Sequence, residues 1–171
     1  MKWKIINDDY LNYLRSKEKR IPKTDYGNDK IKPFFGELMR IDNIVYVTQV
    51  SSPKPRHRTM KNSLDFYKLF KGKEFLAVVN LNFMFPVPLS EISNLDYGHI
   101  DEYVSFLDET TKSKYIALLK QEMSAIEKLN LSETALKIYS LKYKNPDSPI
   151  SKRCFDFKQL EEYAKNYKIK I

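Results

Sequence analysis

The sequence predicts an α+β domain, with a strand-rich part over residues 1–90 and a helix-rich part over residues 100–171. In the first part, short runs of β-branched and aromatic residues follow one another with brief polar turns, which is typical of antiparallel strands. In the second part, apolar residues recur at helical spacing among charged ones. No repeat, linker or low-complexity tract divides the chain. We therefore expect one domain over residues 1–171, in which helices pack on a small barrel or a strongly twisted sheet.

The composition is that of a folded, basic protein. The chain has 171 residues, of which 42% are hydrophobic, and a formal net charge of +8. The positive charge favours a polyanionic partner, most simply nucleic acid, although the ordinary solvation of a lysine-rich protein explains it equally well. The one cysteine, Cys154, excludes an internal disulfide and argues against a thiolate metal site. Without a membrane-spanning apolar run or a signal peptide, the sequence predicts a reduced, cytoplasmic protein with no membrane partner.

The chain opens with a strand candidate, Trp3–Ile6, followed by a short helix that Asn7 or Asp8 can cap. Tyr10 and Leu14 are four residues apart and therefore share one face of this helix. Taken by itself, Tyr10 is more simply a core-edge aromatic residue than a catalytic one.

Residues 16–32 are polar and basic and include Pro22, which predicts a long loop. Tyr26 lies inside it. An aromatic side chain in such a loop can stack on an unpaired RNA base, or it can pin the loop to the core, and the sequence favours neither. Lys32, at the end of the loop, is one of the predicted RNA-binding residues.

Two strand pairs follow. Phe34–Ile41 and Ile44–Val50 form a hairpin around the turn Asp42-Asn43, and Leu64–Phe70 pairs with Phe75–Asn80 across a glycine-containing turn.

The segment Asn82–Pro88 is apolar but contains two prolines, so we expect a buried connector. Helical patterns then cover Thr111–Leu129, a segment that starts at Ser132 and ends before Asn145–Pro149, and Phe155–Tyr167.

The end of the second strand carries the most suggestive chemistry. Ser51 and Ser52 precede Pro53, which cannot donate to a strand ladder, and Lys54 follows. A basic loop comes next, whose predicted RNA-binding residues are Arg56, His57, Arg58 and Lys61. A strand end that presents hydroxyls and a lysine is a common place for functional side chains. From these residues alone, a solvated turn remains the preferred interpretation.

Other enzyme signatures are weak. The glycines form no phosphate-binding loop, and His57 and His99 lack metal-ligand spacing. A ribonuclease pair made of these two histidines ranks low, because nothing in the sequence brings them together. Cys154 precedes an apolar helix and is more simply a core residue than a nucleophile.

Four stretches, in order and at matching spacing, resemble the ToxN/AbiQ family of endoribonuclease toxins from type III toxin–antitoxin systems. Ser51-Ser52-Pro53-Lys54 is similar to the family's Thr/Ser-Ser-Pro-Lys signature. Lys2–Leu14 resembles its opening strand and helix, Phe35–Leu38 its second strand, and Asn80–Pro86 its Asn-Leu-Asn/Lys-Phe-Met motif. The resemblance extends to about Tyr97 and becomes diffuse beyond it.

The resemblance implies a compact, SH3-like (Kid/MazF-like) antiparallel β-barrel decorated with C-terminal helices. It also implies a metal-independent endoribonuclease without a cofactor, which uses the RNA 2′-hydroxyl as nucleophile and leaves a 2′,3′-cyclic phosphate. Lys54 would stabilise the transition state and is a candidate to protonate the leaving group, while Ser51 and Ser52 would hold the phosphate. By the same resemblance, Tyr10 and Tyr26 belong to the active site.

The partners that the resemblance implies are cellular or phage RNA as substrate and a repeat-derived RNA antitoxin, expected as a pseudoknot, that forms a closed assembly with the toxin. A non-catalytic RNA-binding module fits the composition equally well, and a DNA-binding regulator lacks a helix-turn-helix signature. The chain departs from the family pattern at Ser51, where threonine is frequent, which keeps the hydroxyl and loses a methyl group. The Arg56-His57-Arg58 run matches nothing in the family pattern, and its role stays open.

Overall fold

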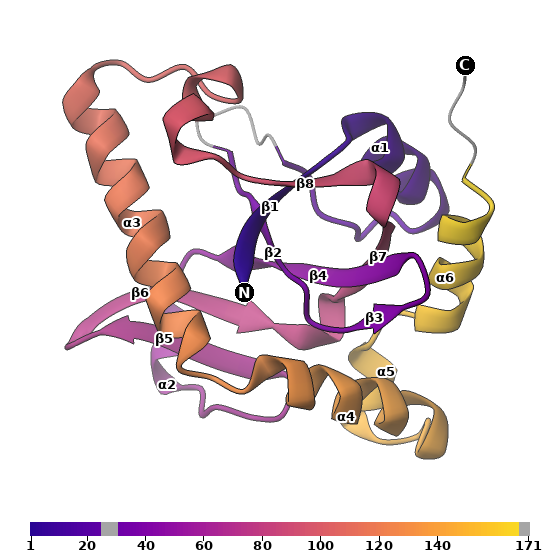
Figure 1. The fold of residues 1–171 in the computed structure, drawn as a ribbon. Helices are drawn as coiled ribbons and strands as arrows, with labels where there is room; N and C mark the ends of the chain where they lie inside the picture. The colour runs from indigo at the N-terminus through magenta and orange to yellow at the C-terminus, as the bar shows by residue number, and fades with distance from the viewer. Residues whose placement is uncertain (25–30, 168–171) are drawn as a thin grey trace.

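The structure, a computed structural model, describes residues 1–24 and 31–167 (Figure 1). The strands are β1 (Lys2–Ile6), β2 (Phe34–Gly36), β3 (Arg40–Ile41), β4 (Ile44–Ser51), β5 (Phe66–Lys71), β6 (Glu74–Asn80), β7 (Phe85–Pro88) and β8 (Ile92–Asn94). The α-helices are α1 (Asp8–Lys17), α2 (Pro55–Thr59), α3 (Glu109–Glu127), α4 (Leu131–Lys144), α5 (Pro149–Arg153) and α6 (Phe157–Lys165), and 3-10 turns span Leu81–Phe83, Leu89–Glu91 and Tyr97–Glu102. The predicted α+β class is therefore confirmed.

Strand β4 is the centre of an antiparallel sheet with the order β5-β6-β4-β2-β1-β8, and β3 and β7 also pair with β4. Different stretches of β4 serve different partners: Tyr46 lies opposite Pro86 of β7, while Val50 lies opposite Val79 of β6. The end strands β5 and β8 do not pair with each other among the described residues. The sheet is thus not closed, and the predicted SH3-like barrel is not confirmed.

The predicted elements differ from the structure in three places in this sheet, one of which is β8, a strand that was not predicted. The single strand expected over Phe34–Ile41 is split into β2 and β3. Asn82–Pro88 is only partly a connector, because its second half is β7. Two prolines are tolerated there since β7 pairs with β4 alone, so the missing N–H groups interrupt no second ladder.

Helices cover the sheet on different sides. Helix α3 runs along one side of the molecule, and α1 and α6 lie on the opposite side (Figure 1). The indole N–H of Trp3 in β1 donates to the Leu119 carbonyl of α3 over 2.9 Å. On the other side, the Tyr46 hydroxyl donates to the buried Glu161 carboxylate of α6 over 2.6 Å. No helix in the described residues is both long and apolar enough to cross a membrane.

Candidate functional site

The C-terminal end of β4 delivers the predicted serine–lysine motif. Ser51 is still in the ladder, opposite Val78 of β6, and pairing ends before Pro53. Helix α2 begins two residues later with Pro55 at its first position, where a missing N–H costs nothing. Lys54 is the residue that precedes this helix, and its side chain is exposed. The proline-bounded turn therefore holds Lys54 close to the two serines along the chain.

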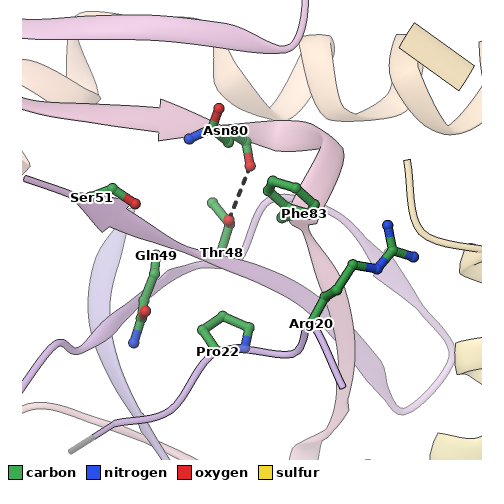
Figure 2. Close-up of a pocket in the computed structure, with 7 residues that line it drawn as sticks. All are labelled: Arg20, Pro22, Thr48, Gln49, Ser51, Asn80 and Phe83. Atoms are coloured by element: carbon green, nitrogen blue, oxygen red, sulfur yellow. Dashed lines mark hydrogen bonds between the residues drawn. The ribbon is translucent and has the colours of Figure 1, made fainter. Parts of the chain in front are cut away.

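The two serines face different cavities. The half-buried Ser51, the last residue of β4, lines a pocket of about 190 Å³, whereas the exposed Ser52, which follows the strand, lines another of about 160 Å³. The Ser51 pocket lies between β4, the end of β6 and the segment after α1 (Figure 2). The Ser52 pocket lies between β4, the residues before β2, and α3.

The Ser51 pocket continues into a second cavity of about 500 Å³, because Arg20, Asn80 and Phe83 line both. We call the two cavities together the Ser51 groove. Its further lining residues are Pro22, Thr48, Gln49, Ser51, Met60, Ser63, Asp65, Phe66, Asn82 and Arg153. It is therefore an elongated depression that begins at the motif and leads toward α5.

Aromatic and amide groups lie together in the groove. Phe83 is half-buried, and its ring packs 5.4 Å from that of Phe155, so one part of it is supported and another faces the groove. Thr48 donates its hydroxyl to the Asn80 backbone carbonyl over 3.3 Å, as Figure 2 shows, which fixes β6 against β4 at this point. Supported rings and side-chain amides are the groups that bind the faces and edges of unstacked bases.

Two arginines in the groove have carboxylate partners. Arg20 forms a short chelate with Glu18, at 2.7 and 2.9 Å, which lowers the pKa of the glutamate and raises that of the arginine. Arg153 binds the buried Asp65 with two nitrogens at 2.9–3.1 Å, yet its side chain is 50% exposed. Both guanidinium groups are thus held in place while they keep surface toward the groove.

His57 has a structural role in α2, and its predicted role in RNA binding stays a prediction. Its side chain is buried, its ring packs 5.6 Å from Phe66, and its Nδ1 accepts the Lys54 backbone N–H over 3.0 Å. Burial, with the neighbouring cations Arg56 and Lys54, lowers its pKa. A neutral imidazole therefore closes the first turn of α2 and fixes the backbone of Lys54.

The other predicted RNA-binding residues divide between two places. Arg56, Arg58 and Lys61 are exposed on and just after α2, where the sequence predicted a loop. Lys32 is half-buried and lines the Ser52 pocket instead. These four predicted cations therefore lie near the end of β4 and do not line the Ser51 groove, whose cationic lining residues are Arg20 and Arg153.

The structure does not bring Tyr10 to the groove. Its side chain is completely buried, and its hydroxyl donates to the Pro86 carbonyl of β7 over 2.7 Å. Burial raises the pKa of the phenol far above its ordinary range. Helix α1 therefore turns Tyr10 toward the core, and its predicted part in the active site, in orienting RNA or assisting proton transfer, stays a prediction. Tyr26 lies outside the described residues.

Gln49 links the groove to the segment that contains Tyr26. Its amide nitrogen donates to the Lys23 carbonyl over 2.7 Å and to the Lys32 carbonyl. The Lys32 N–H also donates to the Thr24 carbonyl over 2.9 Å. One side chain of β4 therefore binds the backbone at both Lys23 and Lys32.

Several groove residues were not singled out from the sequence. Thr48 and Gln49 were visible as polar residues in a hydrophobic strand, and Asn80 and Phe83 belong to the Asn80–Pro86 motif, but no role was assigned to them. Nothing in the sequence marked Arg20 as a groove residue, since its place in the structure depends on the path of the chain after α1. Among the residues that the structure describes, no three His, Cys, Asp or Glu side chains gather in a way that could hold a metal ion.

The comparisons with known proteins agree with one another. The family model described as "Toxin ToxN, type III toxin-antitoxin system" matches residues 2–165. The chain is 32% identical over 107 residues to Endoribonuclease ToxN of Pectobacterium atrosepticum, which covers 58% of this chain and 61% of that relative's length.

Solved structures share the fold over nearly the whole chain. One, from work on a bacterial antiviral system regulated by a processed non-coding RNA, has a TM-score of 0.76 and 24% identity, and covers 98% of this chain and 99% of its own. A second, from work on selective toxin inhibition by a non-coding RNA pseudoknot, has a TM-score of 0.74 and 22% identity, and covers 97% of this chain and 96% of its own. AbiQ, a lactococcal anti-phage endoribonuclease, has a TM-score of 0.75 and 20% identity, and covers 96% of this chain and 95% of its own.

Proposed function

This chain belongs to the ToxN toxin family of type III toxin–antitoxin systems, and on that basis we propose that residues 1–171 form one endoribonuclease domain. The observation that carries the proposal is the end of β4, where Ser51 opens into an elongated groove and Ser52 and Lys54 follow at the surface. The endoribonuclease activity of the relative from P. atrosepticum supports it.

RNA supplies its own nucleophile in the proposed reaction. The 2′-oxygen attacks the adjacent phosphorus and loses its proton, the bond to the 5′-oxygen breaks, and that oxygen takes up a proton. The products are a 2′,3′-cyclic phosphate and a 5′-hydroxyl. The protein has to align the reacting oxygens and stabilise the extra charge on the phosphorane, which suits Lys54 with hydroxyl donors from Ser51 and Ser52. The step requires no metal ion.

The groove provides the proposed path of the RNA. The rings and amides of Phe83 and Asn80 would receive bases on the Ser51 side, and the exposed cations Arg56, Arg58 and Lys61 would contact phosphates. Tyr26 stays a proposed contact at the RNA. We assign Tyr10 a supporting role under β7, where its hydroxyl holds the Pro86 carbonyl.

An RNA antitoxin is the proposed inhibitor, by analogy with the toxin that a non-coding RNA pseudoknot inhibits. It would occupy the same groove and assemble with the toxin into a closed complex. Cellular or phage RNA would be the substrate, and the cytoplasm the compartment where toxin, antitoxin and substrate meet.

The test is incubation of purified protein with total RNA in excess EDTA. We expect discrete fragments that carry 2′,3′-cyclic phosphates. The Ser51→Ala variant should cleave much more slowly while its circular dichroism spectrum and melting temperature stay close to those of the wild type. Stable RNA binding without any cleavage would indicate a non-catalytic RNA-binding module and overturn the proposal.

A further inference from the structure

The pocket on the Ser52 side is built differently from the Ser51 groove. Most of its walls are apolar or aromatic, from Ile31, Val50, Tyr115 and Leu118 among others, while Lys32 and Ser52 add polar groups to the lining. Its volume of about 160 Å³ fits a single flat ring system rather than a larger ligand. The Tyr115 hydroxyl donates to the Ile31 carbonyl, so α3 and the segment before β2 are joined across the pocket wall.

One carboxyl group lies in this apolar surrounding. Glu122 of α3 lines the pocket and is only 6% exposed, and its carboxyl has no hydrogen-bond partner within the described part of the chain. Burial raises its pKa to about 7, although the nearby Lys32 acts in the opposite direction. A buried carboxyl without a partner is costly for a protein to keep. The Glu122 side chain therefore has hydrogen-bonding capacity that the fold does not use.

We propose that this cavity, which we call the Glu122 pocket, receives one RNA base next to the phosphate held at Ser52, and that Glu122 binds an amino group on the Watson–Crick edge of that base. The proposal rests on the proposed function and adds a residue that determines its sequence preference. The apolar walls would cover the faces of the base, while the carboxyl oxygen accepts a hydrogen bond from its edge.

The chemistry of Glu122 predicts which bases fit. Adenine, guanine and cytosine each carry an exocyclic amino group that can donate to a carboxyl oxygen. Uracil carries carbonyl oxygens on either side of its one N–H, and these face a carboxylate unfavourably. At pH 8, where Glu122 is mainly ionised and can only accept, a hydrogen bond to the charged group contributes about 1.5–3 kcal/mol, which corresponds to a preference over uracil of at least about tenfold.

The bases of two neighbouring nucleotides would then bind in separate cavities, one on each side of the end of β4. Ser51 and Ser52 face different cavities, so a chain whose phosphate lies at the strand end can place one base in the Ser51 groove and the next in the Glu122 pocket. Such a splayed arrangement is open to single-stranded RNA, whose bases can unstack.

Binding of the four nucleoside 3′-monophosphates at pH 8, followed by protein NMR titration, tests the pocket independently of cleavage. We expect the adenosine, guanosine and cytidine compounds to bind about tenfold or more tightly than the uridine compound, and to shift the amide signals of Leu119 and Glu122. Glu122→Gln, which has the same shape but can also donate to uracil, should lose this discrimination. Glu109→Gln, an exposed change on the same helix, should keep it.

Equal binding of the four compounds, no binding at millimolar concentration, or unchanged discrimination in Glu122→Gln would each overturn the proposal. Sequencing of the RNA ends gives a second readout: wild-type cleavage should avoid uracil at one position beside the cut, and Glu122→Gln should accept it. A protein that discriminates the nucleotides but cleaves no RNA would refute the proposed function and leave the Glu122 pocket standing.

Discussion

Lys54 is the residue whose role separates catalysis from binding. Methionine has a similar length but no charge, so Lys54→Met should slow cleavage by roughly two to three orders of magnitude, the usual effect of losing one electrostatic donor at the transition state. Antitoxin RNA should still bind, because one phosphate contact among many contributes little to total affinity. The measurements are single-turnover cleavage and equilibrium binding, both in EDTA.

Lys73→Met is the matched control for that prediction. Lys73 is exposed in the turn between β5 and β6 and lines neither the Ser51 groove nor the Glu122 pocket. The control should change neither the rate nor the affinity appreciably. Equal losses of cleavage and binding in Lys54→Met would make Lys54 a docking residue.

The two histidines should respond oppositely to pH. The pKa of His57 is lowered in the folded protein, so the unfolded chain binds a proton more readily, and the stability due to neutral His57 is lost as pH falls below about 6.5. The pKa of His99 is raised by Asp96, so its contribution is present at low pH and is lost as pH rises.

Chemical denaturation between pH 7.5 and 5 tests both signs. His57→Gln should lose less stability on acidification than the wild type, by up to about 1 kcal/mol per pH unit, whereas His99→Gln should lose more. If His57→Gln follows the wild-type slope, then His57 is not held neutral under α2.

At the scale of single elements, α3 buries one carboxyl, that of Glu122, whose ionisation destabilises the folded protein. The pKa of Glu122 is raised to about 7, so above that pH the folded protein holds a buried charge that the unfolded chain exposes to water. Glu122→Gln should therefore increase the free energy of unfolding at pH 8, by about 1–3 kcal/mol, and the gain should shrink toward pH 5. Urea denaturation at both pH values measures it, with Glu109→Gln as control. A variant less stable than the wild type at pH 8 would contradict this picture.

Strand β4 shows what could be predicted from sequence and what could not. Its β-branched run and Pro53 predict both the strand and the place where pairing stops, because these are local properties. The opposite wall of the groove could not be predicted, since Asn80 and Phe83 meet Thr48 only through the register that places Val79 against Val50. The burial of Tyr10 likewise depends on β7, whose Pro86 lies 76 residues away in the chain.

Over the whole molecule, the net charge of +8 predicts salt-sensitive RNA binding, because cations that neutralise phosphates release counterions. Arg58→Glu combined with Lys61→Glu should weaken antitoxin binding and lower the slope of log affinity against log salt by roughly 1 or more. Lys71→Glu combined with Lys73→Glu makes the same charge change at the β5–β6 turn and should leave the slope nearly unchanged. Equal effects of the two pairs would mean that only overall charge matters.

The contacts of Gln49 have a consequence for which substitutions this part of the protein tolerates. Its amide holds the backbone carbonyls of Lys23 and Lys32, and any residue at those two positions supplies the same carbonyl. Substitutions of Lys23 or Lys32 that keep the backbone geometry should therefore leave both attachments to β4 unchanged, whereas loss of the Gln49 amide should remove both at once.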